Sequence, residues 1–151
     1  MAYTSAEGRQ EILDELGEAI EAIATALAAL GVAYEEVDEQ TGDRLEEALF
    51  GPVQKAYGRA KRTYAGFAAR MAMEVDEPAA ATGGAHAGAR ASIDRATSEI
   101  ERADALLSEL QDSMLPVEVG DRELRAGLSE VRELLGPLPA RSRELVRTLG
   151  R

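Results

Sequence analysis

The residues best suited to recognising another molecule are concentrated between positions 52 and 73. This basic stretch contains both lysines of the chain, three of its six aromatic residues and three arginines, and it contains no acidic residue. Guanidinium and ammonium groups bind carboxylates and phosphates, and tyrosine rings can stack on nucleic-acid bases. We therefore expect a partner-binding surface here, formed by Lys55, Tyr57, Gly58, Arg59, Arg62, Tyr64 and Gly66.

Three interpretations of the basic stretch remain open. In the first, its cationic residues meet acidic side chains of the N-terminal helix within the same chain, which fixes helix orientation more than stability. In the second, it binds an acidic helix of another molecule, which can be a second copy of the chain. In the third, Tyr57 or Tyr64 stacks on bases. The net charge of −11 makes nucleic acid the least favoured partner, because phosphate contacts dominate such affinity.

Catalytic chemistry is not indicated by the residue inventory. The chain has no cysteine, and its only histidine, His86, lies in a Gly/Ala-rich segment without a nucleophile or an orienting acid nearby. Di-iron bundles need Glu-x-x-His pairs on two helices, and the sequence contains none. Glycine-rich phosphate loops and nucleophile-elbow motifs are also missing. The sequence predicts a non-enzymatic protein without catalytic residues, metal or cofactor.

A long N-terminal helix is predicted by leucine and isoleucine residues that recur every three or four positions from Leu13 to Leu30. A second row beside them consists of small residues, and a stripe this broad predicts burial against two neighbours. Thr4 and Glu7 have the spacing of a capping box at its start. Gly31 predicts its end, although Tyr34 and Val37 can prolong it. The second row comprises Ala19, Ala22, Ala26 and Ala29.

The basic stretch is predicted to lie on a second long helix that begins at Pro52. Proline removes a backbone donor and clashes with the preceding turn, so we expect a kink or a break there, with a short separate helix over residues 42–50. Gly58 and Gly66 each cost about 1 kcal/mol relative to alanine in a helix. We expect another helix to approach closely at these glycines, and the alanine row of the first helix is the expected partner.

Residues 74–89 form the clearest linker, because Pro78, paired glycines and small side chains give the segment no apolar period. At about 3.3 Å per residue it can span roughly 50 Å, enough to cross the length of a bundle, although the sequence leaves open whether it does.

Apolar residues from Ile93 to Met114 then predict a third helix, followed by a turn. A fourth helix ends before Gly136, and a short helix follows.

The predicted fold is an all-α antiparallel four-helix bundle in one domain. It consists of a helical hairpin over residues 5–73, the linker 74–89 and a hairpin over residues 90–150, with short extra helical segments. The longest uncharged apolar run near the N-terminus, residues 22–34, is shorter than the roughly 20 residues of a membrane span. We therefore expect a cytoplasmic protein that does not bind membranes.

The predicted function is that of an interaction or scaffold protein that forms a homodimer or binds another helical protein. The alanine row, represented by Ala22, Ala26 and Ala29, is expected to contact a second chain together with the basic stretch. The alternative is a bundle that binds a small apolar ligand in a pocket lined by aromatic and methionine side chains, namely Tyr34, Tyr57, Tyr64, Phe67, Met71 and Met73.

Overall fold

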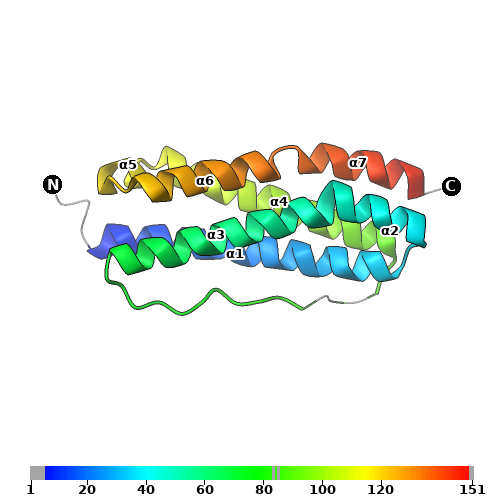
Figure 1. Cartoon of the computed structure of the whole chain (residues 1–151), viewed down its shortest axis with the longest axis horizontal. Coiled ribbons are helices and arrows are strands. Elements are labelled where there is room, and N and C mark those ends of the chain that lie inside the picture. Colours follow the sequence, from blue (N-terminus) through cyan, green and yellow to red (C-terminus); the bar gives the residue numbers. More distant parts are fainter. Residues whose placement is uncertain (1–5, 83, 85, 150–151) are drawn as a thin grey trace.

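The computed structural model describes residues 6–82, 84 and 86–149, and every regular element within these ranges is helical (Figure 1). The predicted all-α class is confirmed. The capping box expected at Thr4 lies outside the described residues. The elements are α1 (Ala6–Glu35), α2 (Glu39–Leu45), the π-helical turn η2 (Glu46–Phe50), α3 (Gly51–Arg70), α4 (Ala89–Asp112), α5 (Leu115–Val119), α6 (Arg122–Leu135) and α7 (Leu138–Leu149).

The long helices lie side by side along one axis, and packed neighbours run in opposite directions (Figure 1). Helix α1 packs against α3 and α4, α3 also packs against α6, and α4 contacts both α6 and α7. The most extensive contacts join α1 to α4 and α3 to α6. The tightest packing therefore connects the segments before and after the linker, rather than the two helices of either predicted hairpin.

The linker runs along the outside of the molecule from the end of α3 to the start of α4, which lie at opposite ends of the long axis (Figure 1). It therefore crosses the whole length of the fold. The described part of the linker contacts the helices at several points. The Tyr64 hydroxyl donates to the Asp76 carbonyl at 3.3 Å, the Ala79 amide donates to Glu21 Oε2 at 3.4 Å, and the Lys61 ammonium lies 4.0 Å from Glu77 Oε1.

Helix α1 forms the centre of the core, and both of its predicted apolar rows are buried except for Leu27, which is half-buried. The broad stripe is covered by two neighbours, α3 and α4, as expected. The prediction that α1 ends at Gly31 is wrong, because the helix continues to Glu35 and buries Val32 and Ala33 beyond the glycine. A helical glycine costs about 1 kcal/mol, which the burial of those two side chains offsets.

By length and composition, α1 is also the one described helix that could cross a membrane. Most of its apolar window is buried inside the fold, and the core helix of a soluble protein has the same properties. Its apolar residues are already covered by α3 and α4, so the packing accounts for its composition.

The predicted break at Pro52 does not occur. Phe50 and Gly51 keep helical backbone angles, and the Gly51 amide donates to the Glu46 carbonyl five residues earlier. This wider turn makes α2, η2 and α3 continuous. In an α-helix, position 52 would supply the N–H for the Ala48 carbonyl, but proline has no N–H. A π turn at this point is a recognised way to fit such a residue into a helix, and π turns are frequent at functional sites.

The second half of the chain follows the predicted helices with two corrections. Met114, expected at the end of the third helix seam, has a left-handed backbone with φ 69° and a side chain that is 51% exposed. The segment that follows is not only a turn, because Leu115–Val119 forms the short helix α5. Helices α6 and α7 then meet at Gly136, whose backbone remains helical.

Candidate functional site

The cationic residues of α3 pair mainly with α6, whereas the first interpretation placed their partners on the N-terminal helix. Arg59 Nε lies 2.7 Å from Glu130 Oε2. Arg70 binds both carboxylate oxygens of Asp121, at 2.7 and 2.8 Å, and also reaches Glu123. The acids of α1 are not the partners because the face of α3 that carries these arginines lies against α6. These ion pairs link α3 to α6.

Asp121 connects this ion pair to the start of α6. Asp121 Oδ1 accepts a hydrogen bond from the Leu124 amide at 2.9 Å, so the side chain caps the N-terminus of α6. Asp121 is only 9% exposed. The hydrogen bonds from Arg70 lower the pKa of the Asp121 carboxyl, and the cap amide lowers it further, against the effect of burial. Asp121 therefore joins α3 to α6 through a charge-assisted contact.

Replacing Asp121 with asparagine is expected to cost about 1.5–3 kcal/mol at neutral pH, since hydrogen bonds to a charged partner are lost while Asn still caps the helix. Because the folded state lowers the pKa of Asp121, this contribution is complete above the ordinary Asp range and disappears as the pH falls through the lowered value. Urea unfolding of both proteins between neutral and acidic pH should show the difference shrinking with acid. Asp94→Asn, at an exposed position on α4, is measured in parallel as a control for the loss of one negative charge.

The other predicted residues of α3 differ in exposure and in partners. Lys55 and Arg62 are exposed and make no ion pair within the described part of the chain. Tyr57 and Tyr64 pack partly against the core, and the Lys61 ammonium lies 4.5 Å from the centre of the Tyr57 ring. Partial burial raises the pKa of the Tyr64 hydroxyl, and the nearby acids Asp14 and Asp76 add to the increase. Neither ring is presented as an open stacking platform.

The alanine row is not available to a second chain. Ala22, Ala26 and Ala29 are at most 1% exposed, because α3 and α4 already cover both rows of α1. The expectation that this row contacts a partner is therefore wrong for the folded chain. The sequence showed that two rows needed covering, but not that the same chain covers both.

The predicted close approach at Gly58 and Gly66 is also wrong. A Cβ atom at Gly58 would meet only Arg62 Nη1 at 3.4 Å, and one at Gly66 only the Arg70 guanidinium, both side chains of α3 itself. The close approach occurs at Gly127 of α6, where a Cβ atom would lie 2.1 Å from Thr63 Oγ1. The sequence did indicate a close helix approach at Gly127, because this glycine falls within the apolar stripe of α6.

Gly58→Ala is accordingly expected to stabilise the protein by up to about 1 kcal/mol. Alanine restores helix propensity, and the flexible end of Arg62 is the only group that has to move. Chemical denaturation of the variant provides the measurement. A loss of stability would show that another helix approaches Gly58 after all.

The residues expected to line an apolar ligand pocket are spread along the molecule. Phe67 is fully buried in the core, whereas Tyr34 is 45% exposed. Tyr34 lies where α1 approaches α2, and Met71 and Met73 follow α3 at the opposite end of the long axis (Figure 1). The structure therefore does not bring Tyr34 and the two methionines together in one pocket.

A concave surface of about 590 Å³ forms a groove between the α2–η2 segment and α7. It was not predicted, and it contains none of the residues of the basic stretch. Its lining combines arginine, glutamate and apolar side chains from segments nearly 100 positions apart in the sequence. We call it the η2–α7 groove, and it is lined by Arg44, Glu47, Ala48, Arg141, Glu144, Leu145 and Thr148.

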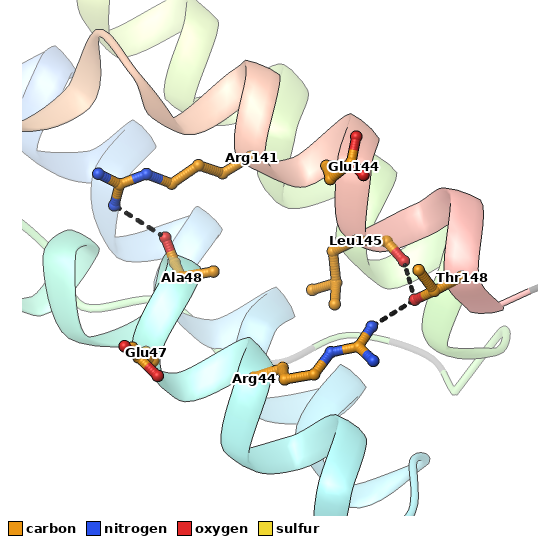
Figure 2. A pocket seen from close by; sticks show the side chains of 7 residues that line it. All are labelled: Arg44, Glu47, Ala48, Arg141, Glu144, Leu145 and Thr148. Atoms are coloured by element: carbon orange, nitrogen blue, oxygen red, sulfur yellow. Dashed lines mark hydrogen bonds between the residues drawn. The ribbon is translucent and has the colours of Figure 1, made fainter.

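Two arginines cross the groove in opposite directions (Figure 2). Arg44 of α2 donates to the Thr148 hydroxyl on α7, and Arg141 of α7 donates to the Ala48 carbonyl of η2 at 3.4 Å. Leu145 lies between them and is 5% exposed. Both acceptors are neutral, and within residues 6–82, 84 and 86–149 neither guanidinium is ion-paired.

The proline of α3 explains one of these contacts. Because Pro52 cannot donate to the Ala48 carbonyl, that oxygen can accept a hydrogen bond from outside the helix. Arg141 supplies it from α7. The π turn therefore positions one cationic end of the groove, and Arg44, in the last turn of α2, positions the other.

The groove offers hydrogen-bond donors that a carboxylate could use. A guanidinium has five N–H donors, so each arginine keeps donors free for a carboxylate. The described residues contain no group of three or more His, Asp or Glu side chains placed to hold a metal ion. The sequence could not reveal this site, because only the fold brings Arg44 and Arg141 together.

In comparisons with known proteins, no protein-family model, no curated protein and no solved structure gives a significant match to this chain.

Proposed function

We propose that the protein is a non-enzymatic interaction protein, and that its partner, another helical protein, docks in the η2–α7 groove. The observation that carries the proposal is the pair of guanidinium groups that cross an open groove while bonded only to neutral acceptors. Arginine is enriched at the energetically important positions of protein interfaces. The proposal includes a cytoplasmic location and excludes nucleic acid, given the net charge of −11.

A second copy of the chain is the less favoured partner. The reason to expect a homodimer was the second row of α1, and that row is buried within the chain. Sedimentation equilibrium at tens of micromolar should therefore show a monomer. A dimer that dissociates in the double variant Arg44→Glu/Arg141→Glu would identify the second copy as the occupant of the groove.

The shape of the groove favours a protein partner over a small molecule. Small-ligand sites bury about 70–90% of the ligand surface. The η2–α7 groove is open along its length. Its main apolar side chain, Leu145, is already buried, with only 5% of its surface exposed. A small ligand would therefore leave much of its surface in water here, whereas a protein segment can extend its contact over the surrounding surfaces of α2 and α7.

Site-specific photo-cross-linking in cells tests the proposal. A benzoylphenylalanine residue at Glu47, on the rim of the groove, should give a discrete cross-linked product that disappears in the Arg44→Glu/Arg141→Glu background. The matched control is Arg122→Glu/Arg143→Glu, which changes the net charge equally at two exposed positions outside the groove. The proposal fails if cross-linking is equal in all backgrounds, or if a probe at Glu101 on α4 gives the same product.

A further inference from the structure

We infer that the groove recognises an amphipathic helix with two acidic residues about two turns apart and an apolar residue between them. This inference rests on the proposed function, since it names the chemistry of the partner segment. It follows from the order of groups along α7 and from the charges that the groove leaves without ion pairs.

The groove presents charge, apolar surface and charge in a line. Arg141, Leu145 and Thr148 are spaced i, i+4 and i+7, so they lie on one face of α7. The Arg44 guanidinium is bonded to Thr148 and therefore marks the second cationic point. At 1.5 Å rise per residue, positions 141 and 148 are about 10 Å apart along the helix axis.

A helix lying alongside α7 has a matching spacing. An acidic residue at i, an apolar residue at i+4 and an acidic residue at i+7 share one face of such a helix. The two carboxylates would reach Arg141 and Arg44, and the apolar side chain would lie over Leu145 and Ala48. Neither arginine has to break an ion pair to accept a carboxylate, because its present acceptors are a hydroxyl and a carbonyl. Bidentate arginine–carboxylate contacts add geometric specificity.

The acids in the groove restrict where the partner can carry charge. Glu144 is paired with Arg147, and Figure 2 shows its carboxylate directed away from Leu145. Glu47 is exposed on the opposite wall and has no ion pair within the described residues. These two groups repel a uniformly acidic segment or a phosphate backbone. Acids limited to the two positions that face the arginines avoid this repulsion.

A second copy of the chain does not carry the complementary pattern on its acidic helix. The exposed face of α1 bears Glu11, Asp14, Glu18 and Glu21, spaced by three or four residues. That face has no exposed apolar side chain between its acids, because the apolar residues of α1 are turned into the core. We therefore assign the groove to a different chain.

The test measures binding of a designed helical peptide by fluorescence anisotropy. The probe is an alanine-based peptide of more than about 15 residues, since shorter helices are marginal in water, with Glu, Leu and Glu at i, i+4 and i+7. A control peptide has the same composition with one Glu moved to the opposite face. A third peptide replaces both Glu residues with Lys. Each is titrated with the wild type, with Arg44→Glu/Arg141→Glu and with Arg122→Glu/Arg143→Glu, after circular dichroism has confirmed folding.

We expect the first peptide to bind the wild type at least about tenfold more tightly than the groove variant, and to bind the Arg122→Glu/Arg143→Glu control like the wild type. The Lys peptide should prefer the groove variant, which reverses both charges. Equal affinities for the two Glu peptides would overturn the spacing. Equal losses in both double variants would overturn the groove as the site.

Two further outcomes would replace the inferred occupant. Saturable binding of decanoate that requires both arginines, without peptide binding, would assign the groove to a small amphipathic carboxylate. Groove-dependent self-association in sedimentation would assign it to a second copy. If no peptide binds but the cross-link from position 47 persists, the helical pattern is wrong and the proposed function stands. If the cross-link is also lost, both are wrong.

Discussion

Leu107→Ala is expected to lower the free energy of unfolding by about 2–5 kcal/mol, the usual cost of deleting a fully buried leucine side chain. Leu107 is 0% exposed and belongs to α4, the helix most extensively packed against α1. The loss has two sources, the transfer energy of the removed methyl groups and the cavity that remains. Since single domains are stable by about 5–15 kcal/mol, a loss of this size is a large part of the total.

The adjacent residue provides a matched control. Leu106→Ala removes the same atoms at a half-buried position on the same helix, so its cost should be clearly smaller. Urea unfolding of the two variants under identical conditions gives both values. Equal costs, or a Leu107 variant with an unchanged midpoint, would show that α4 does not turn this face into the core.

Gly127→Ala is expected to destabilise the protein by about 1–3 kcal/mol, although alanine is the better helix former. The added methyl group would lie 2.1 Å from Thr63 Oγ1 and 2.7 Å from Thr63 Cγ2. Thr63 cannot easily move away, because its side chain is 4% exposed and its hydroxyl is hydrogen-bonded to the Arg59 carbonyl and guanidinium. Helices α3 and α6 would have to separate.

A double-mutant cycle with Thr63→Ala isolates this contact. The second substitution removes two of the three close atoms and leaves only Thr63 Cβ, at 2.9 Å. The double variant should therefore be more stable than the sum of the two single costs implies. Purely additive costs would mean that the two side chains are not in contact. Gly58→Ala is the control, because it is expected to raise the stability of the protein. That result would show that the loss at Gly127 is not general to glycine in these helices.

The sequence predicted the elements whose signals are periodic. The apolar spacing of α1 and α4 defines which face is buried, and the structure buries that face. Predictions based on single residues were less successful. Gly31 and Pro52 were expected to end or interrupt helices, yet burial beyond Gly31 and a π turn before Pro52 let both helices continue.

The candidate site could not be predicted for a different reason. An apolar row shows that a surface must be covered, but not which segment covers it, and so the alanine row was assigned to a second chain. The cationic residues of α3 were visible as a cluster, but the acids that bind Arg59 and Arg70 lie on α6, which only the fold places beside α3. Arg44 and Arg141 carry no periodic signal that relates them. Their positions in one groove depend on the antiparallel packing of the α2–η2 segment against α7.

The measurement that tests the central claim most directly is a nuclear magnetic resonance titration of the isotope-labelled protein with the Glu–Leu–Glu peptide. We expect the largest amide and side-chain shift changes at Arg44, Ala48, Leu145 and Thr148, with little change along α3. Shift changes centred on Lys55 and Arg62 would contradict the account. They would return the binding surface to the exposed cationic face of α3 and leave the η2–α7 groove without a role.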